Sequence, residues 1–560
     1  MISGAELVVK ALIEEEVEVC FAYPGGQAID LFDALYERKE FRVILPRHEQ
    51  GLIHAADGYA RSTGKVGVCM VTSGPGATNL ITGIATAAYD ASPLVCFTGQ
   101  VATHLIGKDA FQEVDMVGIS RSVAKYAVTV KRREELGTVI KKAFTIAQTG
   151  KPGVVVVDIP KNIQQQLGTE AYPKTVAIRG YHPQTTTSGE KIKQAIEWLN
   201  QAQTPVLLVG GGVHRGKAYQ QLCKLAEDYG LPVVTTIMGK GALPSDHACY
   251  IGNAGIHGSF SANQALVTCD LLFAIGTRLN DRVTGNSTSF CSSAKVIHLD
   301  IDPAAIGKNI ETDLSLVGDV GCILAQINQE SPAKTHKKWT KTLKQAALDQ
   351  PIHMPESGLT PEAILSAINQ LFSSAIVVTD VGQNQLWTTQ FLQVNQEREL
   401  LTSGGLGTMG YGFPAALGAK VGNPEKDVLV ITGDGGFQMN LQELATAVIE
   451  KIPVIICIFN NGCLGNVRQW QEMFYDKRYS FTDLLSDERS YVPDFIALAH
   501  SYGVEAVRVV EEKQIEVALR QAKKSVERPF LIEFILESQQ KVLPIVPPGQ
   551  SLEEMILYGE

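Results

Sequence analysis

The sequence predicts an α/β fold with three doubly wound domains, each built on a parallel β-sheet with helices on both faces. Short apolar runs alternate with longer helical patterns, which is typical of parallel sheets. Examples of the runs are residues 43–45, 67–72, 94–98 and 154–158. The length of 560 residues exceeds what one hydrophobic core supports, so several domains are expected.

Two stretches interrupt this alternation and divide the chain. Residues 164–189 are rich in Thr and Pro and are interpreted as a linker, and residues 330–359 hold one polar helix between Pro and Lys residues. The predicted domains are therefore residues 1–165, 190–335 and 360–540, followed by a Pro-rich C-terminal tail at 541–560.

Composition excludes several classes of partner. The net charge of −10 argues against nucleic acid or an anionic membrane as the main partner. The longest apolar runs are of strand length and too short to span a bilayer, and the N-terminus lacks a signal-peptide pattern. Ten cysteines stand singly without a CxxC pair, which indicates reduced thiols. We expect a cytoplasmic protein.

The most specific motif pair lies in the third predicted domain. Gly433, Asp434, Gly435 and Gly436 directly follow the apolar run 428–432, and Asn460-Asn461 follow the run 454–459. Ligands of parallel sheets lie beyond the carboxyl ends of the strands, so both motifs point to one crevice. Glycines let the backbone approach a phosphate, and carboxylate and amide oxygens suit Mg²⁺. The alternative is two ordinary strand-to-loop turns.

This pair resembles the diphosphate-binding motif of the thiamine-diphosphate enzymes. The resemblance implies that Asp434, Asn461 and the main-chain carbonyl of Cys463 bind Mg²⁺. Residues 43–50 are predicted to form a strand that ends in a carboxylate, Glu49. Glu49 resembles the family's activating glutamate, which bonds the aminopyrimidine ring and promotes loss of the thiazolium C2 proton. In the family these two motifs come from neighbouring subunits, which implies a dimer.

Further segments make the chain similar to the acetohydroxyacid (acetolactate) synthases over its whole length. They are residues 23–26, 48–51, 54–61, 72–79, 109–113, 404–410 and 467–471. The resemblance implies an enzyme of branched-chain amino-acid biosynthesis that decarboxylates pyruvate. It would transfer the hydroxyethyl unit to a second 2-ketoacid, either pyruvate or 2-ketobutyrate. It also implies a homodimer or homotetramer and leaves open a separate regulatory subunit.

The resemblance assigns catalytic roles residue by residue. Beside Glu49, Phe111 and Gln112 would line the pocket over the thiazolium, and Lys161 would lie near the substrate path. Arg282 would bind the carboxylate of the second ketoacid. Met409 would force the cofactor into its bent conformation, and Trp470 would shape the acceptor pocket.

The same resemblance implies three domain functions: pyrimidine binding (1–165), FAD-like binding (190–335), and diphosphate and Mg²⁺ binding (360–540). The residues assigned to thiamine diphosphate are Tyr23, Pro24, Gly25, Glu49, Asn79, Val381, Gly382, Gln383, Asn384, Gly407, Met409, Gly433, Asp434, Gly435, Gly436, Asn461, Cys463, Leu464, Gly465 and Asn466. Those assigned to a structural FAD are Lys151, Gly210, Gly211, Gly212, Thr236, His257, Gly276, Arg278, Arg282, Asp300, Ile301, Gly318 and Asp319.

Five positions depart from the synthase pattern. Asn384 replaces a His, Lys151 replaces an Arg, residues 52–53 replace two small residues, and Asn466 replaces a Met in the catalytic crevice. A polar amide in an apolar wall favours an alternative: a related carboligase, hydrolase or acyltransferase with a more polar substrate. A cofactor-binding regulatory protein without turnover is a further alternative, against which the intact Glu49 argues.

Overall fold

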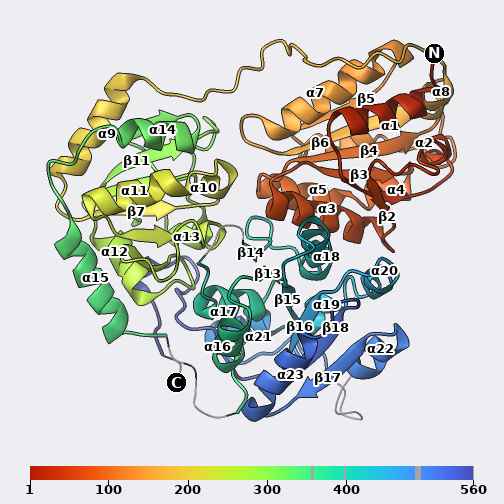
Figure 1. Ribbon diagram of the computed structural model, residues 1–560. Coiled ribbons are helices and arrows are strands. Elements are labelled where there is room, and N and C mark those ends of the chain that lie inside the picture. Colours follow the sequence, from red (N-terminus) through yellow and green to blue (C-terminus); the bar gives the residue numbers. More distant parts are fainter. Residues whose placement is uncertain (353, 355–357, 396–398, 486–492, 559–560) are drawn as a thin grey trace.

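The computed structural model describes residues 1–352, 354, 358–395, 399–485 and 493–558. Within them the chain forms three six-stranded sheets flanked by helices, seen in Figure 1 as one reddish, one green and one blue unit. The strands of each sheet pair in parallel, as in β3–β4, β7–β10 and β15–β16. The predicted fold class is confirmed.

The first sheet has the strand order β2-β1-β3-β4-β6-β5. Its strands are β1 (Val19–Tyr23), β2 (Arg42–Ile44), β3 (Gly67–Val71), β4 (Leu94–Gln100), β5 (Tyr126–Thr129) and β6 (Val154–Pro160). Every residue of β3, β4 and β6 is buried, as expected where helices cover both faces. One face packs on α1 (Gly4–Glu14), α2 (Ile29–Ala34) and α7 (Leu136–Gln148); the other packs on α3 (Glu49–Thr63) and α5 (Ile81–Tyr89).

The second sheet has the order β12-β11-β10-β7-β8-β9. Its strands are β7 (Pro205–Val209), β8 (Val233–Thr235), β9 (Tyr250–Asn253), β10 (Leu271–Ile275), β11 (Lys295–Asp300) and β12 (Leu314–Val317). Its covering helices are α9 (Gly189–Gln201), α11 (Tyr219–Tyr229) and α14 (Val320–Ile327) on one face, and α12 (Phe260–Thr268) and α15 (Lys337–Asp349) on the other. Ile545, Val546 and Leu552 of the C-terminal tail also pack on this second face.

The third sheet has the order β14-β13-β15-β16-β18-β17. Its strands are β13 (Ile376–Thr379), β14 (Leu400–Leu401), β15 (Val428–Gly433), β16 (Ile455–Asn460), β17 (Glu505–Val509) and β18 (Phe530–Ile535). Its covering helices are α16 (Pro361–Leu371), α17 (Gln383–Phe391) and α23 (Ile515–Ala522) on one face, and α18 (Gly412–Gly422), α20 (Glu443–Ile449) and α22 (Phe495–Ser501) on the other.

The predicted strand ends shift by one or two residues, and one local prediction is wrong. Glu49 does not end a strand: β2 stops at Ile44, and Glu49 is the first residue of α3. Pro46 has no N–H to continue a ladder, and the ring of His48 caps the helix by accepting a hydrogen bond from the Gln50 amide.

The first and third units meet where α3 packs on α18 (Figure 1). Glycines bring the two backbones into contact. A Cβ on Gly58 would lie 2.0 Å from the carbonyl oxygen of Ala415, and one on Gly418 would lie 1.7 Å from that of Ala55. Buried Arg61 adds a polar link, because it pairs with Asp57 at 2.9 Å and donates to the Thr402 carbonyl at 2.6 Å. The two units are thereby held at a fixed distance.

All ten cysteines are free, as the sequence predicts. Among the residues that the structure describes, no helix combines the length and apolar character that crossing a membrane requires.

We predict that Gly418→Ala destabilises the protein, because its methyl group would collide with the α3 backbone, and such overpacking costs about 1–3 kcal/mol or more. The midpoint of thermal unfolding should fall. The control is Gly189→Ala at the start of α9, where a Cβ meets nothing within 4 Å. Equal midpoints for wild type and Gly418→Ala would contradict the close approach.

Candidate active site

Asp434 and Asn461 lie at the carboxyl ends of two neighbouring strands. Asp434 begins the short helix α19 (Asp434–Phe437) directly after β15, and Asn461 follows β16, which pairs with β15. Asp434 is 4% exposed. Burial raises the pKa of its carboxyl to about 7, although hydrogen bonding from the Gly462 backbone acts to lower it. A desolvated carboxyl of this kind suits a cation that supplies the missing charge.

The Asn461 side chain is oriented by Gln383. Its Nδ2 donates to Gln383 Oε1 at 2.9 Å, which leaves the amide oxygen as its ligand atom. Gln383 is itself fixed, because its Nε2 donates to Gln469 Oε1 and to the Gln540 carbonyl, both at 3.0 Å. Gly465 must be small here: a Cβ would lie 2.0 Å from Gln383 Oε1.

Cys463 is held in a short antiparallel pairing. The Leu464 amide donates to the Thr482 carbonyl, and the Leu484 amide donates to the Gly462 carbonyl, each at 2.8 Å. The Cys463 thiol is buried, which raises its pKa to about 12, and sulfur is a poor ligand for a hard cation such as Mg²⁺. Of the polar groups of this residue, the carbonyl is the suitable donor for a hard cation.

The turn after β13 faces the turn after β15. Gly382 has φ +142°, and Asn384 Oδ1 lies 3.3 Å from the position of a Cβ on Gly382. Asn384 is buried and bonds to main chain at both ends of its amide: Nδ2 donates to the Ile431 carbonyl at 3.3 Å, and Oδ1 accepts the Gln385 amide at 2.7 Å. In this chain Asn384 therefore braces the glycine turns.

Asp380, which sequence reasoning missed, joins two predicted cofactor segments. Its buried carboxylate accepts the amides of Val381 at 2.8 Å, Gly410 at 3.0 Å and Gly412 at 2.9 Å. It thus holds the Val381 turn and the loop that carries Met409. Met409 Cε lies 3.6 Å from the position of a Cβ on Gly435, so this loop reaches the Asp434 turn. The sequence feature that could have identified Asp380 is its position as an acid directly after a buried strand.

The predicted residues of the first unit gather at the carboxyl end of its sheet. Asn79 Nδ2 donates to Glu49 Oε2 at 2.9 Å, and Tyr23 ends β1. Lys161 Nζ donates to the Gly26 carbonyl at 2.7 Å. Phe111 is 85% exposed. Among the described residues, no hydrogen bond or ion pair joins Glu49 to Asp434 or Asn461.

A cavity of about 1410 Å³ lies between all three units. The predicted cofactor and substrate residues that line it are Lys151, Gly211, Gly212, Thr236, His257, Gly276, Arg278, Arg282, Asp300, Ile301, Asp319, Val381, Gly382, Gly407, Asn466 and Trp470. Gly210 and Gly318 are not among the lining residues. A Cβ on Gly210 would lie 2.4 Å from the Gly276 carbonyl oxygen, so this glycine serves strand packing. The volume exceeds the roughly 300–1,000 Å³ of an ordinary ligand pocket.

Charged groups mark the middle-unit side of this cavity. Burial raises the pKa of Asp300 to about 6. Lys151 Nζ donates to Asp302 Oδ2 at 3.1 Å, so the ammonium sits beside this acidic strand end. His257 is bonded through Nδ1 to the Pro544 carbonyl at 3.2 Å, and its burial lowers its pKa to about 4, which keeps the ring neutral. The Arg282 side chain is 63% exposed and faces Asp281 at 3.6 Å.

Two polar atoms in the third-unit wall are buried without a hydrogen-bond partner: Asn466 Oδ1 and Trp470 Nε1. Both residues belong to α21 (Gly465–Phe474) and line the cavity. A buried polar atom without a partner costs about 1–3 kcal/mol, so these two atoms reduce the stability of this wall.

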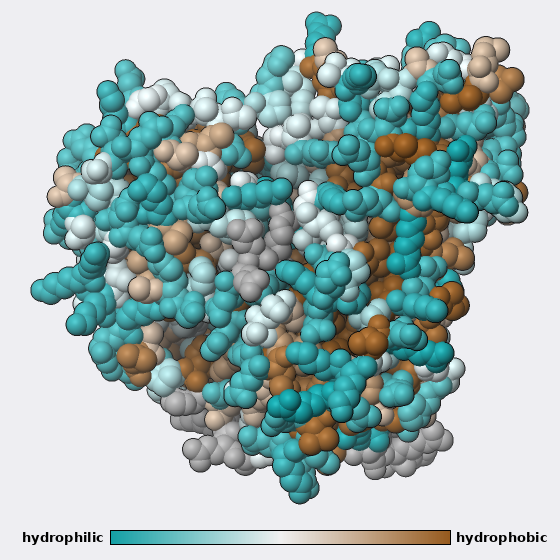
Figure 2. Space-filling view, viewed as in Figure 1, coloured by the Kyte–Doolittle hydropathy of each residue, from teal (hydrophilic) through white to brown (hydrophobic). Residues whose placement is uncertain are grey.

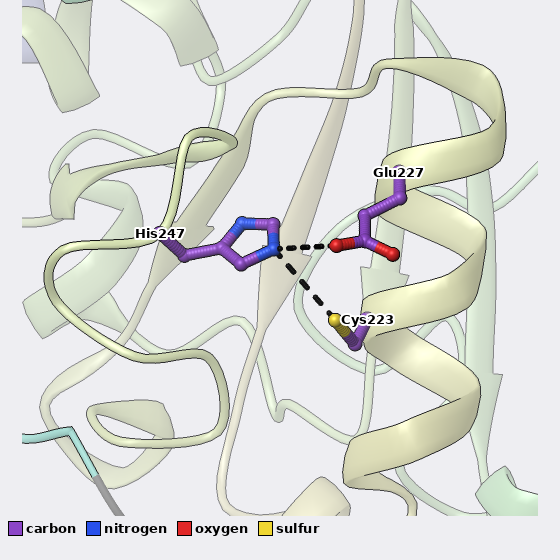
Figure 3. Close-up of side chains that lie close together, drawn as sticks. All are labelled: Cys223, Glu227 and His247. Atoms are coloured by element: carbon purple, nitrogen blue, oxygen red, sulfur yellow. Dashed lines mark hydrogen bonds and ion pairs between the residues drawn. The ribbon is translucent and has the colours of Figure 1, made fainter.

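Cys223, Glu227 and His247 form a separate cluster of potential metal ligands on the middle unit (Figure 3). His247 Nδ1 accepts the Cys249 amide at 3.1 Å, so in the neutral ring the proton is on Nε2. That same Nε2 faces Glu227 at 3.2 Å and Cys223 at 3.7 Å. A protonated nitrogen cannot bind a metal, and burial together with Glu227 raises the pKa of the Cys223 thiol. The cluster is a satisfied hydrogen-bond group.

Three family models match the chain in succession. They are the N-terminal TPP binding domain of thiamine pyrophosphate enzymes (residues 2–119), their central domain (192–327) and their C-terminal TPP binding domain (380–534). A "Probable acetolactate synthase large subunit" of Methanocaldococcus jannaschii is 45% identical over 99% of this chain and 95% of its own length. The chain belongs to the acetolactate synthase family of thiamine pyrophosphate enzymes.

Bacterial members of this family are similarly close. An "Acetolactate synthase" of Mycobacterium leprae is 44% identical over 99% of this chain and 90% of its own length. The "Acetolactate synthase isozyme 3 large subunit" of Escherichia coli is 42% identical over 100% of this chain and 99% of its own length. Family membership therefore extends over the whole chain, including the tail that packs on the middle unit.

We predict that the difference in stability between the wild type and Asp380→Asn depends on pH, because the Asp380 carboxyl titrates and the Asn amide does not. Burial raises the pKa of Asp380 to about 6, above its unfolded value of about 3.9. Its stabilising effect is therefore full below that unfolded value and is lost as pH rises through about 6. From pH 4.5 to 7.5 the thermal midpoint of the wild type should fall relative to that of Asp380→Asn. A constant difference would contradict this environment.

Proposed function

We propose that the protein is an acetolactate synthase. It removes CO₂ from pyruvate and joins the remaining hydroxyethyl unit to a second 2-ketoacid, pyruvate or 2-ketobutyrate. The observation that carries this proposal is the pairing of Asp434 with Asn461 at adjacent strand ends, opposite the glycine turn at Gly382. The names of relatives that are 42–45% identical over nearly the whole chain support it.

The donor set fits Mg²⁺ and a diphosphate. Asp434 is a buried carboxyl, Asn461 offers an amide oxygen and Cys463 a carbonyl, all hard oxygen donors. Gly382 and Gly433 leave the space around Asn384 open for the close approach of a phosphate. These residues would hold Mg²⁺ and the diphosphate of thiamine diphosphate. The bound cofactor supplies the electron sink needed for the loss of CO₂.

Glu49 would hold and return a proton at the aminopyrimidine ring. Asn79 occupies its Oε2, so Oε1 is the oxygen that would face the ring. Met409 would support the cofactor from the loop that Asp380 fixes. Phe111, Gln112 and Lys161 would complete the donor side.

The acceptor side would be built in the cavity wall. Arg282, exposed there, would bind the carboxylate of the second ketoacid through its guanidinium. Trp470 would shape the pocket around the acceptor's alkyl group.

A homodimer or homotetramer would build each site from two copies, with Glu49 from one and Asp434 from the other, and exposed apolar surface supports such an assembly. Large apolar side chains of both cofactor units are exposed, among them Ile29, Phe111, Met439, Ile449 and Phe481. Figure 2 shows hydrophobic surface across the side where the first and third units meet. We also propose a separate regulatory subunit, since relatives are named large subunits, and a cytoplasmic location.

FAD would occupy the middle-unit part of the cavity in a structural role. Gly211 and Gly212 let its phosphates approach, and Asp300 and Asp319 lie where carboxylates could bond adenosine hydroxyls. The neutral ring of His257 and the Arg278 guanidinium border the same space. The domain functions proposed are pyrimidine binding in 1–165, FAD binding in 190–335, and diphosphate and Mg²⁺ binding in 360–540.

One observation favours a second candidate, a related carboligase, hydrolase or acyltransferase with a more polar substrate. Asn466, a polar residue, lines the cavity from α21 together with Trp470. Mass spectrometry of the products from pyruvate alone separates the candidates. Negligible acetolactate together with rapid turnover of a polar ketoacid or aldehyde would establish the second.

We predict that wild-type enzyme given pyruvate, thiamine diphosphate and Mg²⁺ forms 2-acetolactate and CO₂. Glu49→Gln should slow this by about 10²–10⁴-fold, because an amide cannot exchange a proton with the ring, while cofactor stays bound. The control, Glu190→Gln, changes an exposed residue of α9. Near-normal turnover in Glu49→Gln would remove Glu49 from its role.

A further inference from the structure

Glu443, the first residue of α20, reaches from the third unit into the first. Its side chain is 1% exposed. Oε1 and Oε2 each accept the Arg47 amide at 3.0 Å, and Oε1 also accepts the His48 amide at 3.0 Å. The Thr446 hydroxyl donates to Oε2 at 2.6 Å, which fixes the carboxylate within its own helix.

The two amides bound by Glu443 immediately precede Glu49. Between the end of β2 at Ile44 and the start of α3 at Glu49, Pro46 has no N–H to offer. The Glu443 carboxylate also packs against the first turn of α3, since a Cβ on Gly51 would lie 2.5 Å from Oε1. This one side chain therefore holds the segment that leads into α3.

We propose that Glu443 is a positioning residue for Glu49, acting through the Arg47 and His48 amides. This rests on the proposed function, in which Glu49 exchanges a proton with the cofactor. A proton-transfer group must be placed to within about 0.5 Å, and a displacement of 1 Å can cost about 10²-fold in rate. Asn79 holds one oxygen of Glu49, so the backbone that carries Glu49 must be held by other groups.

A carboxylate suits this task better than a neutral side chain. Two acceptor oxygens meet two backbone N–H groups and one hydroxyl, and such charge-assisted bonds are about twice as strong as neutral ones. Gln at this position would offer one acceptor and turn an NH₂ group toward an N–H donor. The buried carboxyl has a raised pKa because of desolvation, which the same three bonds oppose.

Glu443→Gln tests the proposal, and Glu450→Gln is its matched control. Glu450 follows the other end of α20 and also contacts β2, where Arg42 Nη2 donates to its Oε2 at 3.0 Å. That ion pair is at the start of β2, away from Glu49, and a surface pair of this kind contributes little to stability. Amide hydrogen exchange of residues 47 and 48 is measured in the cofactor-free proteins. The kcat and KM for pyruvate are measured with thiamine diphosphate and Mg²⁺.

Glu443→Gln should speed exchange of both amides by about 10-fold or more and lower kcat by about 10–100-fold, with KM unchanged within about twofold. Glu450→Gln should leave all three unchanged. Glu443→Asp, which keeps both oxygens on a shorter chain, should recover part of kcat, and it replaces Glu443→Gln if the latter does not fold.

Three results would overturn the proposal. The first is an exchange rate of the two amides in Glu443→Gln equal to that of the wild type, and the second is faster exchange in Glu443→Gln with an unchanged kcat. The third is a loss of kcat in Glu450→Gln equal to that in Glu443→Gln. Failure of the proposed function is distinguishable, because then wild type itself forms no acetolactate.

Discussion

The contact of α3 with α18 is the constraint on which the rest of the structure depends. Gly58 and Gly418 bring the two backbones together, so the first and third sheets have little freedom to slide. Protein interiors are close-packed. Two helices whose backbones touch directly are held more rigidly than two helices separated by side chains, which can change rotamer. The carboxyl ends of both sheets, which carry Glu49 and Asp434, are therefore placed by the same helix pair.

Buried carboxyls then fix the loops at these sheet ends. Asp380 accepts three backbone amides and ties together two segments of the third unit. Glu443 accepts two more across the contact between units. Each replaces water with backbone N–H groups, which is how a buried charge becomes tolerable. Burial raises the pKa of Asp434 to about 7 despite its backbone bonds, and this fits a partner of opposite charge.

The pairing of Asp434 with Asn461 could be predicted, because strands that are neighbours in a parallel sheet end at the same edge. The three-sheet fold followed from the alternation of apolar runs with helical segments. Asp380 could have been found in the same way, because it directly follows a buried strand next to β15. Glu443 could not, since the amides it binds are about 400 residues away. Gly210 showed a further limit, because a glycine required for strand packing looks in sequence like one that binds phosphate.

The central claim is that each active site combines Glu49 from one copy of the chain with Asp434 from another. The most direct measurement mixes Glu49→Gln and Asp434→Ala chains, each inactive alone, under conditions that let subunits exchange. Random pairing into symmetric dimers gives about one intact site in four, so about a quarter of wild-type acetolactate formation should return. Activity no greater than the sum of the separate variants, in a mixture where mixed dimers are shown to form, would contradict the claim.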